Sequence, residues 1–397
     1  MSISSTDVHF DPYDHELVVD PYPLYRRMRD EAPLYYNEPL DFFAVTRFAD
    51  VSRVLQDFET FSSAKGDILE IIRADMEMPS GVLIFEDPPM HPIHRKMLSR
   101  LFTPKRIAAL EPKIRDFCVK ALDPLVGRGG FDFIADIGAQ VPMKAIGMLL
   151  GIPESEQETV RDMVDAALRT EAGTTMAPDQ FLFDTDAFGQ YVDWVYENPS
   201  DDIISQLIRA EFVDEKGTTR TLTRDEVMVY VTVLAGAGNE TTGRLIGWAG
   251  KTLGDNPDQR QALVENPALI PNAIEELLRY EPPGPFMCRW VTKDVEVLGT
   301  TIPRGSVMMA ILAAANRDER RYEDAEKFDV RRGDIEHLTF GGGIHYCLGN
   351  ALARLEGIVA LEEILKRFPT WQVDMDAARL GPTSTVRGWE TLPVTTP

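Results

Sequence analysis

The stretch from Thr223 to Gly254 constrains the fold most strongly, because it predicts one uninterrupted helix. Thr223 and Glu226 form a capping-box signature, in which each side chain satisfies a backbone N–H at the start of a helix. Gly254 and Pro257 supply the signals that end it. At 1.5 Å per residue such a helix is about 48 Å long. It must therefore cross the whole molecule, and the rest of the chain has to pack around it.

The middle of this helix departs from ordinary helical composition. Its sequence is Ala235-Gly236-Ala237-Gly238-Asn239-Glu240-Thr241-Thr242. Each glycine costs up to about 1 kcal/mol relative to alanine, so a reason for the glycines is expected. One interpretation is purely structural, in which a threonine hydroxyl bonds back to the carbonyl four residues earlier and bends the helix.

A second constraint is the loop Phe340-Gly341-Gly342-Gly343-Ile344-His345-Tyr346-Cys347-Leu348-Gly349. Its consecutive glycines allow positive φ and a close approach to a flat ligand. Apolar residues then recur at helical spacing, so Cys347 is predicted to lie at a helix N-terminus. There the dipole and free N–H groups would lower the pKa of the thiol and favour a metal-binding thiolate. The alternative is a small buried apolar residue at a glycine turn.

The spacing Phe-x-x-Gly-x-x-x-Cys-x-Gly, with His345 two residues before Cys347, resembles the haem-binding signature of the cytochrome P450 family of haem-thiolate monooxygenases. The resemblance implies a mainly α-helical protein with small β-sheets, the cytochrome P450 fold. It also implies haem b (iron protoporphyrin IX) as cofactor, with Cys347 as the ligand of the iron. Phe340, Gly341, His345 and Gly349 would belong to the cofactor-binding loop.

Three basic residues outside this loop are implied to bind the haem propionates. His91 and Arg95 lie four apart on one face of an expected helix. Arg289 opens a strand-like segment, and arginine can hold a carboxylate through its planar fork. The alternative for His91 and Arg95 is a solvated basic patch on an ordinary helix.

The family resemblance also gives the central helix a catalytic interpretation. Its Gly-x-Glu-Thr segment is implied to run over the distal face of the haem. Ala237 and Gly238 would leave room there for dioxygen. Glu240 and Thr241 would help to deliver the protons that oxygen activation needs.

Glu276 and Arg279 match the family's Glu-x-x-Arg motif. Most ion pairs at this spacing lie on the surface and contribute under about 0.5 kcal/mol. The position of this pair between the central helix and the cysteine loop predicts a buried structural pair behind the haem. Lys327 stands where the family usually adds an arginine, and lysine lacks the bidentate fork. Whether Lys327 completes a three-residue network stays open.

Apolar side chains are expected to wall a substrate pocket. In the resembled family the segment Val82–Phe85 belongs to a stretch that closes over the substrate. The apolar character of these four residues is explained equally well if they are ordinary core residues. The predicted pocket residues are Leu83, Ile84, Phe85, Ala237, Phe286, Met287 and Val386.

Composition narrows the class of protein. The 397 residues contain no repeat or linker, so one cytochrome P450 domain over 1–397 is expected. A net charge of −23 argues against nucleic acid and anionic membranes as partners. We find neither a signal peptide nor an apolar run long enough to span a bilayer, and three scattered cysteines fit a reducing compartment. A cytoplasmic protein without a membrane anchor is expected.

Helical periodicity predicts most of the remaining elements. Strands are expected near 41–45, after 286 and beyond 371, with a hairpin over 211–222. Helices are expected over 21–31, 48–58, 106–126, 136–150, 154–169, 179–196 and 272–280, with a polar loop over 170–178.

The resemblance implies a monooxygenase that inserts one oxygen atom from O₂ into an apolar terpenoid, sterol or fatty acid. Axial thiolate donation favours O–O cleavage. No flavin or nicotinamide domain is apparent, so electrons are expected from a separate ferredoxin and ferredoxin reductase. The donor is expected to dock on the cysteine-side face, through a local basic cluster of Lys96, Arg100, Lys105, Arg106 and Arg354. Two alternatives remain: a haem protein that only binds gas or carries electrons, and a peroxygenase that uses hydrogen peroxide.

Overall fold

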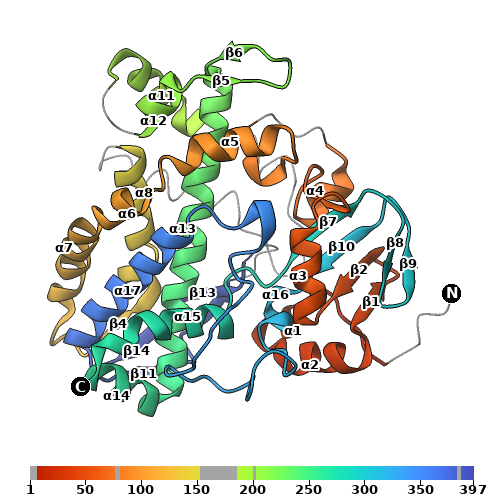
Figure 1. Cartoon of the computed structure of the whole chain (residues 1–397). Coiled ribbons are helices and arrows are strands. Elements are labelled where there is room, and N and C mark those ends of the chain that lie inside the picture. The colour runs from red at the N-terminus through yellow and green to blue at the C-terminus, as the bar shows by residue number, and fades with distance from the viewer. Residues whose placement is uncertain (1–6, 77–80, 153–185, 200–202, 382–385) are drawn as a thin grey trace.

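The computed structural model describes residues 7–76, 81–152, 186–199, 203–381 and 386–397. Helices form most of the described chain, and small sheets lie to one side of them (Figure 1). The prediction of a mainly α-helical protein with small β-sheets is confirmed. The helix expected over 154–169, the loop expected over 170–178 and the first part of the helix expected over 179–196 lie outside the described residues.

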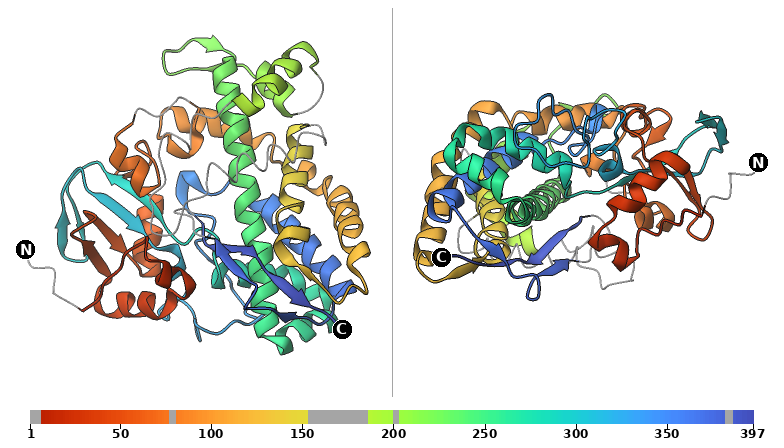
Figure 2. Two further views of the ribbon diagram at one scale, coloured as in Figure 1. Left: turned by 180° about the vertical axis from the view of Figure 1, so that it is seen from behind. Right: turned by 90° about the horizontal axis from the view of Figure 1, so that it is seen from below.

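Helix α13, Arg224–Asp255, runs through the middle of the molecule in all three views (Figures 1 and 2). The predicted capping box is confirmed, since Thr223 and Glu226 bond reciprocally at its start. Two glycines allow close packing against η3, a π-helical segment at Phe133–Gly138. A Cβ on Gly243 would lie 2.7 Å from the Gly138 carbonyl oxygen, and one on Gly250 would lie 2.6 Å from the Phe133 ring.

The other helices surround α13 or cover the main sheet (Figure 2). Those that precede it are α1 (His15–Val19), α2 (Tyr22–Glu31), α3 (Phe48–Gln56), α4 (Leu69–Ala74), α5 (Met90–Ser99), α6 (Pro104–Ala108), α7 (Glu111–Leu122), α8 (Val141–Leu150), α11 (Asp186–Glu197) and α12 (Ile203–Arg209). Those that follow are α14 (Pro257–Glu265), α15 (Ile270–Tyr280), α16 (Leu312–Ala315) and α17 (Asn350–Arg367). Short 3₁₀ turns are η1 (Leu83–Phe85), η2 (Asp123–Leu125), η4 (Pro267–Leu269) and η5 (Gly343–His345).

Two expected helices are broken. The helix expected over 106–126 is divided into α6, α7 and η2, and Pro112 stands in the first turn of α7. The helix expected over 136–150 is divided into η3 and α8, and Pro142 stands in the first turn of α8. Proline lacks the backbone N–H that a continuous helix would need, whereas a first turn tolerates it.

The main sheet joins two distant parts of the chain. Its strand order is β1-β2-β10-β7-β3, with β2 and β10 parallel and the other pairs antiparallel. These strands are β1 (Leu34–Asn37), β2 (Phe42–Val45), β3 (Phe61–Ser62), β7 (Met287–Val291) and β10 (Val307–Ala310). The sequence predicted the β1–β2 pair but not its continuation through β10 and β7.

Smaller sheets complete the fold. The predicted hairpin over 211–222 is confirmed as β5 (Phe212–Val213) paired with β6 (Thr219–Arg220). The remaining strands are β4 (Gly130–Asp132), β8 (Val295–Val297), β9 (Thr300–Ile302), β11 (Gln372–Val373), β12 (Arg379–Gly381), β13 (Gly388–Thr391) and β14 (Pro393–Thr395). They pair as β11-β14-β4, β12-β13 and β8-β9.

One segment corrects the expectation that no stretch could span a bilayer. Among the described residues, Phe133–Leu150 is long and apolar enough by length and composition, with mean hydropathy 1.3 over 18 residues. It comprises η3 and α8, and 67% of it is buried inside the protein. A segment buried to this extent belongs to the protein core, where it packs against α13.

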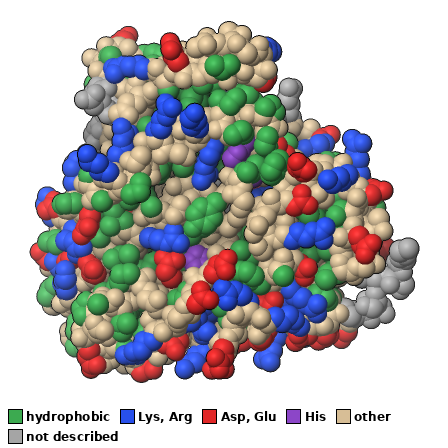
Figure 3. Space-filling model, in the orientation of Figure 1, with side chains coloured by type: hydrophobic (Ala, Val, Ile, Leu, Met, Phe, Trp, Pro, Cys, Tyr) green, Lys and Arg blue, Asp and Glu red, His purple; other side chains and the backbone are tan. Residues whose placement is uncertain are grey.

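Charge is unevenly distributed over the face seen in Figure 3. Lys and Arg side chains gather on its upper part, where Figure 1 places α5 and α6, whereas acidic side chains are frequent below. Lys96, Arg100 and Lys105 are exposed in this region. This local excess of positive charge contrasts with the net charge of −23 of the whole chain.

Candidate active site

A cavity of about 440 Å³ lies beside the middle of α13, and most of the side chains that line it are apolar. Its volume is within the range of small-molecule sites. It brings together most of the residues that the sequence singled out. Those that line it are Leu83, Ile84, Arg95, Ala237, Gly238, Glu240, Thr241, Phe286, Met287, Arg289, Phe340, His345, Cys347, Gly349 and Val386.

Three predicted site residues do not line the cavity. Phe85 packs in a separate apolar cluster with Ile71 and Val82, because the three side chains of a 3₁₀ turn such as η1 point in different directions. Gly341 shapes the loop, with φ 71°. His91 is buried behind the cavity wall, where its ring centroid lies 4.5 Å from that of His345.

The cysteine loop places Cys347 slightly before the helix rather than in it. Helix α17 begins at Asn350, and Gly349 occupies the N-cap. The Cys347 N–H donates to the Phe340 carbonyl at 2.8 Å, which closes the loop. Gly343 has φ 61°, and a Cβ there would lie 2.9 Å from the Leu55 carbonyl oxygen. Both the conformation and the contact therefore favour glycine at position 343.

The electrostatics of the thiol differ from expectation. Burial raises the pKa of Cys347, although backbone N–H groups of Gly349 and Asn350, together with Arg95, act in the opposite direction. The predicted effect of the backbone N–H groups is present, but the prediction of a lowered pKa is wrong in net, because the cost of burying an anion exceeds the effect of the donors. The donors nevertheless point at the sulfur and would favour a thiolate once a cation is bound.

On α13, the acid and the alcohol face the same cavity. The Thr241 hydroxyl donates to the Ala237 carbonyl at 2.9 Å. This is the back-bond to the residue four positions earlier that a structural interpretation predicts. The hydroxyl also lies in the cavity wall, so the hydrogen bond orients it there and does not bury it.

Glu240 is held by a neighbour that the sequence reading did not consider. Arg244 donates to Glu240 Oε1 at 3.2 Å and to the Trp389 carbonyl in β13. A Cβ on Gly388 would lie 2.5 Å from Arg244 Cδ, so this glycine makes room for the guanidinium. The i,i+4 spacing of an acid and a base was the available signal.

Comparison with known proteins identifies the family. The family model described as cytochrome P450 matches residues 185–384. A steroid C26-monooxygenase of Mycobacterium tuberculosis is 34% identical over 380 residues, which are 93% of this chain and 92% of that protein. This chain belongs to the cytochrome P450 family. It is a cytochrome P450 monooxygenase, and its cofactor is haem with a thiolate ligand.

Solved structures of other P450s have the same fold. CYP109E1 from Bacillus megaterium, in complex with testosterone, is 28% identical with a TM-score of 0.86, covering 96% of this chain and 99% of that one. A mutant of P450 EryK in complex with erythromycin B is 34% identical with a TM-score of 0.85, covering 95% and 96%. The prediction of the cytochrome P450 fold is confirmed.

The edge of the cavity suits the haem of a P450. Nε2 of His91 and Nε2 of His345 are buried, and neither has a hydrogen-bond partner among the described residues, although Asp87 Oδ1 lies 3.7 Å from Nε2 of His345. Arg289 is buried, and within the described part of the chain it donates hydrogen bonds only to the Cys288 carbonyl and Met287 Sδ. Such groups require an acceptor, and a propionate carboxylate would supply one.

Arg95 and His91 belong to the same edge. Arg95 donates to the Tyr346 carbonyl at 2.5 Å, which connects α5 to the cysteine loop of this P450. Burial, the nearby His345 and Arg95 itself lower the pKa of His91 to about 4. His91 is therefore neutral near pH 7 and retains one N–H to donate.

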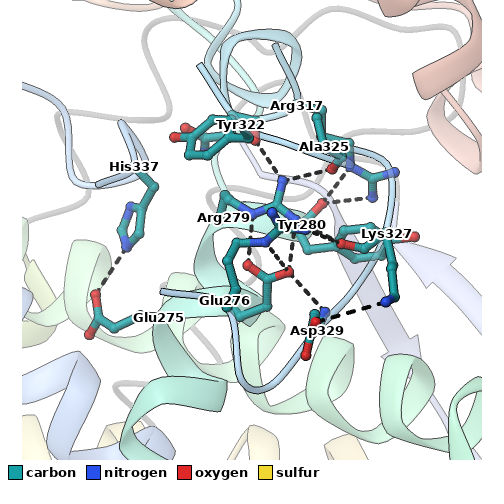
Figure 4. Close-up of polar contacts among 12 residues, drawn as sticks. Glu275, Glu276, Arg279, Tyr280, Arg317, Tyr322, Ala325, Lys327, Asp329 and His337 are labelled. Atoms are coloured by element: carbon teal, nitrogen blue, oxygen red, sulfur yellow. Dashed lines mark hydrogen bonds and ion pairs between the residues drawn. The ribbon is translucent and has the colours of Figure 1, made fainter. Parts of the chain in front are cut away.

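Glu276 and Arg279 form a fully buried ion pair, with N–O distances of 2.7 and 2.8 Å (Figure 4). Arg332, which the sequence reading missed, supplies a further cation at 3.1 Å from Glu276 Oε1. Lys327 offers only its backbone carbonyl to Arg279, while its ammonium points toward Asp329. The network is therefore completed by Arg332 and not by the Lys327 side chain.

Proposed function

We propose that this P450 inserts one oxygen atom into an unactivated C–H bond of a largely apolar ring compound of the terpenoid or sterol class. The observation that carries this proposal is one cavity with Cys347 at one side, Glu240 and Thr241 at another, and apolar walls between them. Haem iron, when bound, supplies the oxygen-activating chemistry. The protein must then orient the substrate, exclude water and supply protons.

Cys347 is the proposed ligand of the iron. Its sulfur faces the cavity and receives two backbone N–H donors, and a thiolate is the form that binds metal. The proposed propionate partners are Arg95, Arg289 and His345, with His91 behind them. Phe340 and Gly349 would contact the cofactor, and Gly341 would act only through the loop conformation.

Glu240 and Thr241 are proposed to move protons. The Thr241 hydroxyl is held in the cavity wall by the Ala237 carbonyl, and the Glu240 carboxylate is held by Arg244. The pair is therefore oriented before substrate arrives, which is what efficient proton transfer needs. Ala237 and Gly238 are proposed to leave space beside it, because both line the cavity and neither carries a side chain larger than a methyl group.

Leu83, Ile84, Phe286, Met287 and Val386 are proposed to contact the substrate. Each buried CH₂ group contributes about 0.8 kcal/mol. An ionised group among these residues would lose hydration at a cost of several kcal/mol. The steroid and macrolide named for two similar structures are large ring compounds, which supports this class. A linear fatty acid with its carboxylate at the cavity mouth is the alternative.

We propose a small acidic ferredoxin with its reductase as the source of electrons. Arg95 ties α5 to Tyr346, which is next to Cys347, so the exposed Lys96 and Arg100 lie close to the cysteine loop. Opposite charge raises encounter rates. A cytoplasmic location would give access to such a donor.

The first experiment tests the ligand of the iron. The reduced protein with carbon monoxide should show the red-shifted Soret band of thiolate haem, and Cys347→Ser should lose it. Retention of the band in Cys347→Ser would place the ligand elsewhere. Cys118→Ser is a control, because Cys118 is a buried thiol outside the cavity.

The second experiment tests the substrate class. Haem absorption is titrated with a ring compound and a linear acid of equal carbon count, and the ring compound should bind more tightly. Product that depends on reductant and O₂ would distinguish a monooxygenase from a peroxygenase or an electron carrier. A response to small charged compounds only would defeat the assignment of the pocket.

A further inference from the structure

Asp67 is a charged group in the cavity wall that neither the haem nor the proton path explains. It lies between β3 and α4 and lines the cavity. Its Oδ1 is buried and has no hydrogen-bond partner among the described residues. A buried carboxylate oxygen without a partner is costly, so a ligand or a function is expected to compensate for it.

The position of Asp67 is fixed by its backbone. The Cys288 N–H of β7 donates to the Asp67 carbonyl at 2.7 Å. Gly66 precedes it with φ 111°, and a Cβ on Gly66 would lie 2.6 Å from the Ile71 side chain. The turn therefore depends on glycine, and it presents the carboxylate to the cavity from a constrained main chain.

Haem binding would leave Asp67 without a partner. A propionate would offer acceptors to the imidazole nitrogens of His91 and His345. The carboxylate of Asp67 is itself an acceptor, and two ionised carboxylates cannot satisfy each other. Burial raises the pKa of Asp67, although Arg289 and His345 act in the opposite direction, and a bound propionate would compete for both.

Two other charged side chains in the wall have partners: Glu240 pairs with Arg244, and Arg95 donates to the Tyr346 carbonyl. Glu356 of α17 receives a hydrogen bond from Thr242, although its Oε1, like Oδ1 of Asp67, is buried without a partner among the described residues. Glu356 belongs to the helix that follows the cysteine loop, whereas Asp67 lies on the turn before α4.

We infer that Asp67 is a specificity-determining residue that accepts a hydrogen bond from a hydroxyl group on the substrate. This inference rests on the proposed function and narrows its substrate class to ring compounds that carry a hydrogen-bond donor away from the oxidised carbon. The cavity wall holds a second buried group of this kind, the Thr232 hydroxyl of α13, which also has no described partner. An apolar skeleton with one donor would satisfy Asp67 while filling the apolar walls.

The test uses the haem-loaded full chain and three probes that share one skeleton: a saturated steroid alcohol, its methyl ether and its ketone. Dissociation constants come from the shift in haem absorption on binding. The alcohol should bind the native protein more tightly than the ether by about tenfold or more, as expected for a hydrogen bond to a charged acceptor. Asp67→Asn should weaken binding of the alcohol by a similar factor and leave the ether unchanged.

Asp75→Asn is the matched control. Asp75 lies on the same segment but is exposed and pairs with Lys65, outside the cavity. This variant removes one negative charge and should alter neither dissociation constant. The carbon monoxide band is recorded for every variant, so that failure of the haem-thiolate assignment is distinguished from failure at Asp67.

Three results would overturn the inference. Preference of the native protein for the ketone would mean that Asp67 is protonated and donates. Equal weakening of alcohol and ether in Asp67→Asn, or no response to any of the three probes, would remove Asp67 from substrate recognition. A shift in the haem reduction potential of ligand-free Asp67→Asn, with unchanged binding of the alcohol, would assign the residue to the haem edge.

Discussion

At the scale of single residues, the cavity depends on side chains whose orientation is set by a second residue. Arg244 holds Glu240, and the Ala237 carbonyl holds the Thr241 hydroxyl. The acid and the alcohol are thus fixed by hydrogen bonds that do not involve substrate. Loss of either chemical group should change the reaction more than it changes the structure.

Thr241→Ala should keep haem and substrate binding but release reduced oxygen as hydrogen peroxide, because the oriented hydroxyl is lost. The amount of product formed per reductant consumed should fall by about tenfold or more. This loss is smaller than the roughly 10²–10⁴-fold that general acid–base catalysis contributes, because water can substitute in part for the hydroxyl. Thr241→Ser keeps the hydroxyl and should remain close to the native ratio. An unchanged ratio in Thr241→Ala would mean that the hydroxyl only shapes the helix.

Sequence reasoning found residues with a local signature and missed those that meet only in space. The glycine loop, the capping box at Thr223 and the Glu276–Arg279 spacing are visible in a few adjacent residues. Arg332 reaches Glu276 across 56 positions of the chain. Asp67 looks like an ordinary turn residue until β7 places it in the cavity wall. The roles of Cys347 and the other site residues stay predictions.

At the scale of helices and loops, buried ion pairs connect α15 to its surroundings. Glu276 and Arg279 lie on this helix and contact the segment 316–332. Glu275 lies beside them and pairs with Arg354 of α17 at 2.6 Å, and His337 lies 3.2 Å from its second oxygen. Arg354 is therefore not available as part of the basic surface that the sequence suggested.

Arg279→Leu should destabilise the protein by about 3–5 kcal/mol, because it leaves the Glu276 carboxylate buried beside Arg332 alone. Arg332→Leu should cost about 1–3 kcal/mol, since the main pair remains. Lys327→Leu should change stability by under about 0.5 kcal/mol, because its side chain is 61% exposed. Urea unfolding of the three haem-loaded variants measures this order. Equal loss in Lys327→Leu and Arg332→Leu would contradict the assignment of Arg332.

The stability that Glu275 provides should depend on pH. Burial alone would raise the pKa of this carboxyl, but hydrogen bonds from His337 and Arg354 lower it to about 2 from its ordinary 4.5. Because the unfolded state then binds the proton more readily, the contribution is fully present above pH 4.5 and disappears as the pH falls toward 2. The difference in unfolding free energy between native protein and Glu275→Gln should shrink over this range. A constant difference would show that Glu275 is not ionised in the folded protein.

At the scale of the whole molecule, a strongly acidic chain keeps a basic surface beside its cysteine loop. Lys96 of α5, Arg100 just after it and Lys105 of α6 are exposed, and Figure 3 shows Lys and Arg side chains gathered over the part of the surface where these helices lie. Of the two other residues that the sequence added, Arg106 donates to Gln206 and Arg354 pairs with Glu275. The remaining three residues define the proposed docking surface.

Electron transfer from an acidic ferredoxin should slow by about tenfold at low salt in a Lys96→Glu, Arg100→Glu double variant, and its dependence on ionic strength should weaken. Lys293→Glu is a suitable control, because this exposed residue lies in the turn between β7 and β8. Stopped-flow reduction at several salt concentrations measures both effects. Native rates that do not respond to salt would exclude this surface.

The order of strands in the main sheet has a consequence for how the protein is made. Strand β2 ends at Val45, yet its parallel partner β10 ends at Ala310, so the edge of β2 cannot be paired until about 265 further residues have left the ribosome (310 − 45). At roughly 5–20 residues per second this takes roughly 13–50 s. Throughout that interval the nascent chain carries an apolar strand that can pair with β1 on one edge and is unpaired on the other. Cys347 follows Ala310 in the chain, so a complete haem pocket also forms late in synthesis.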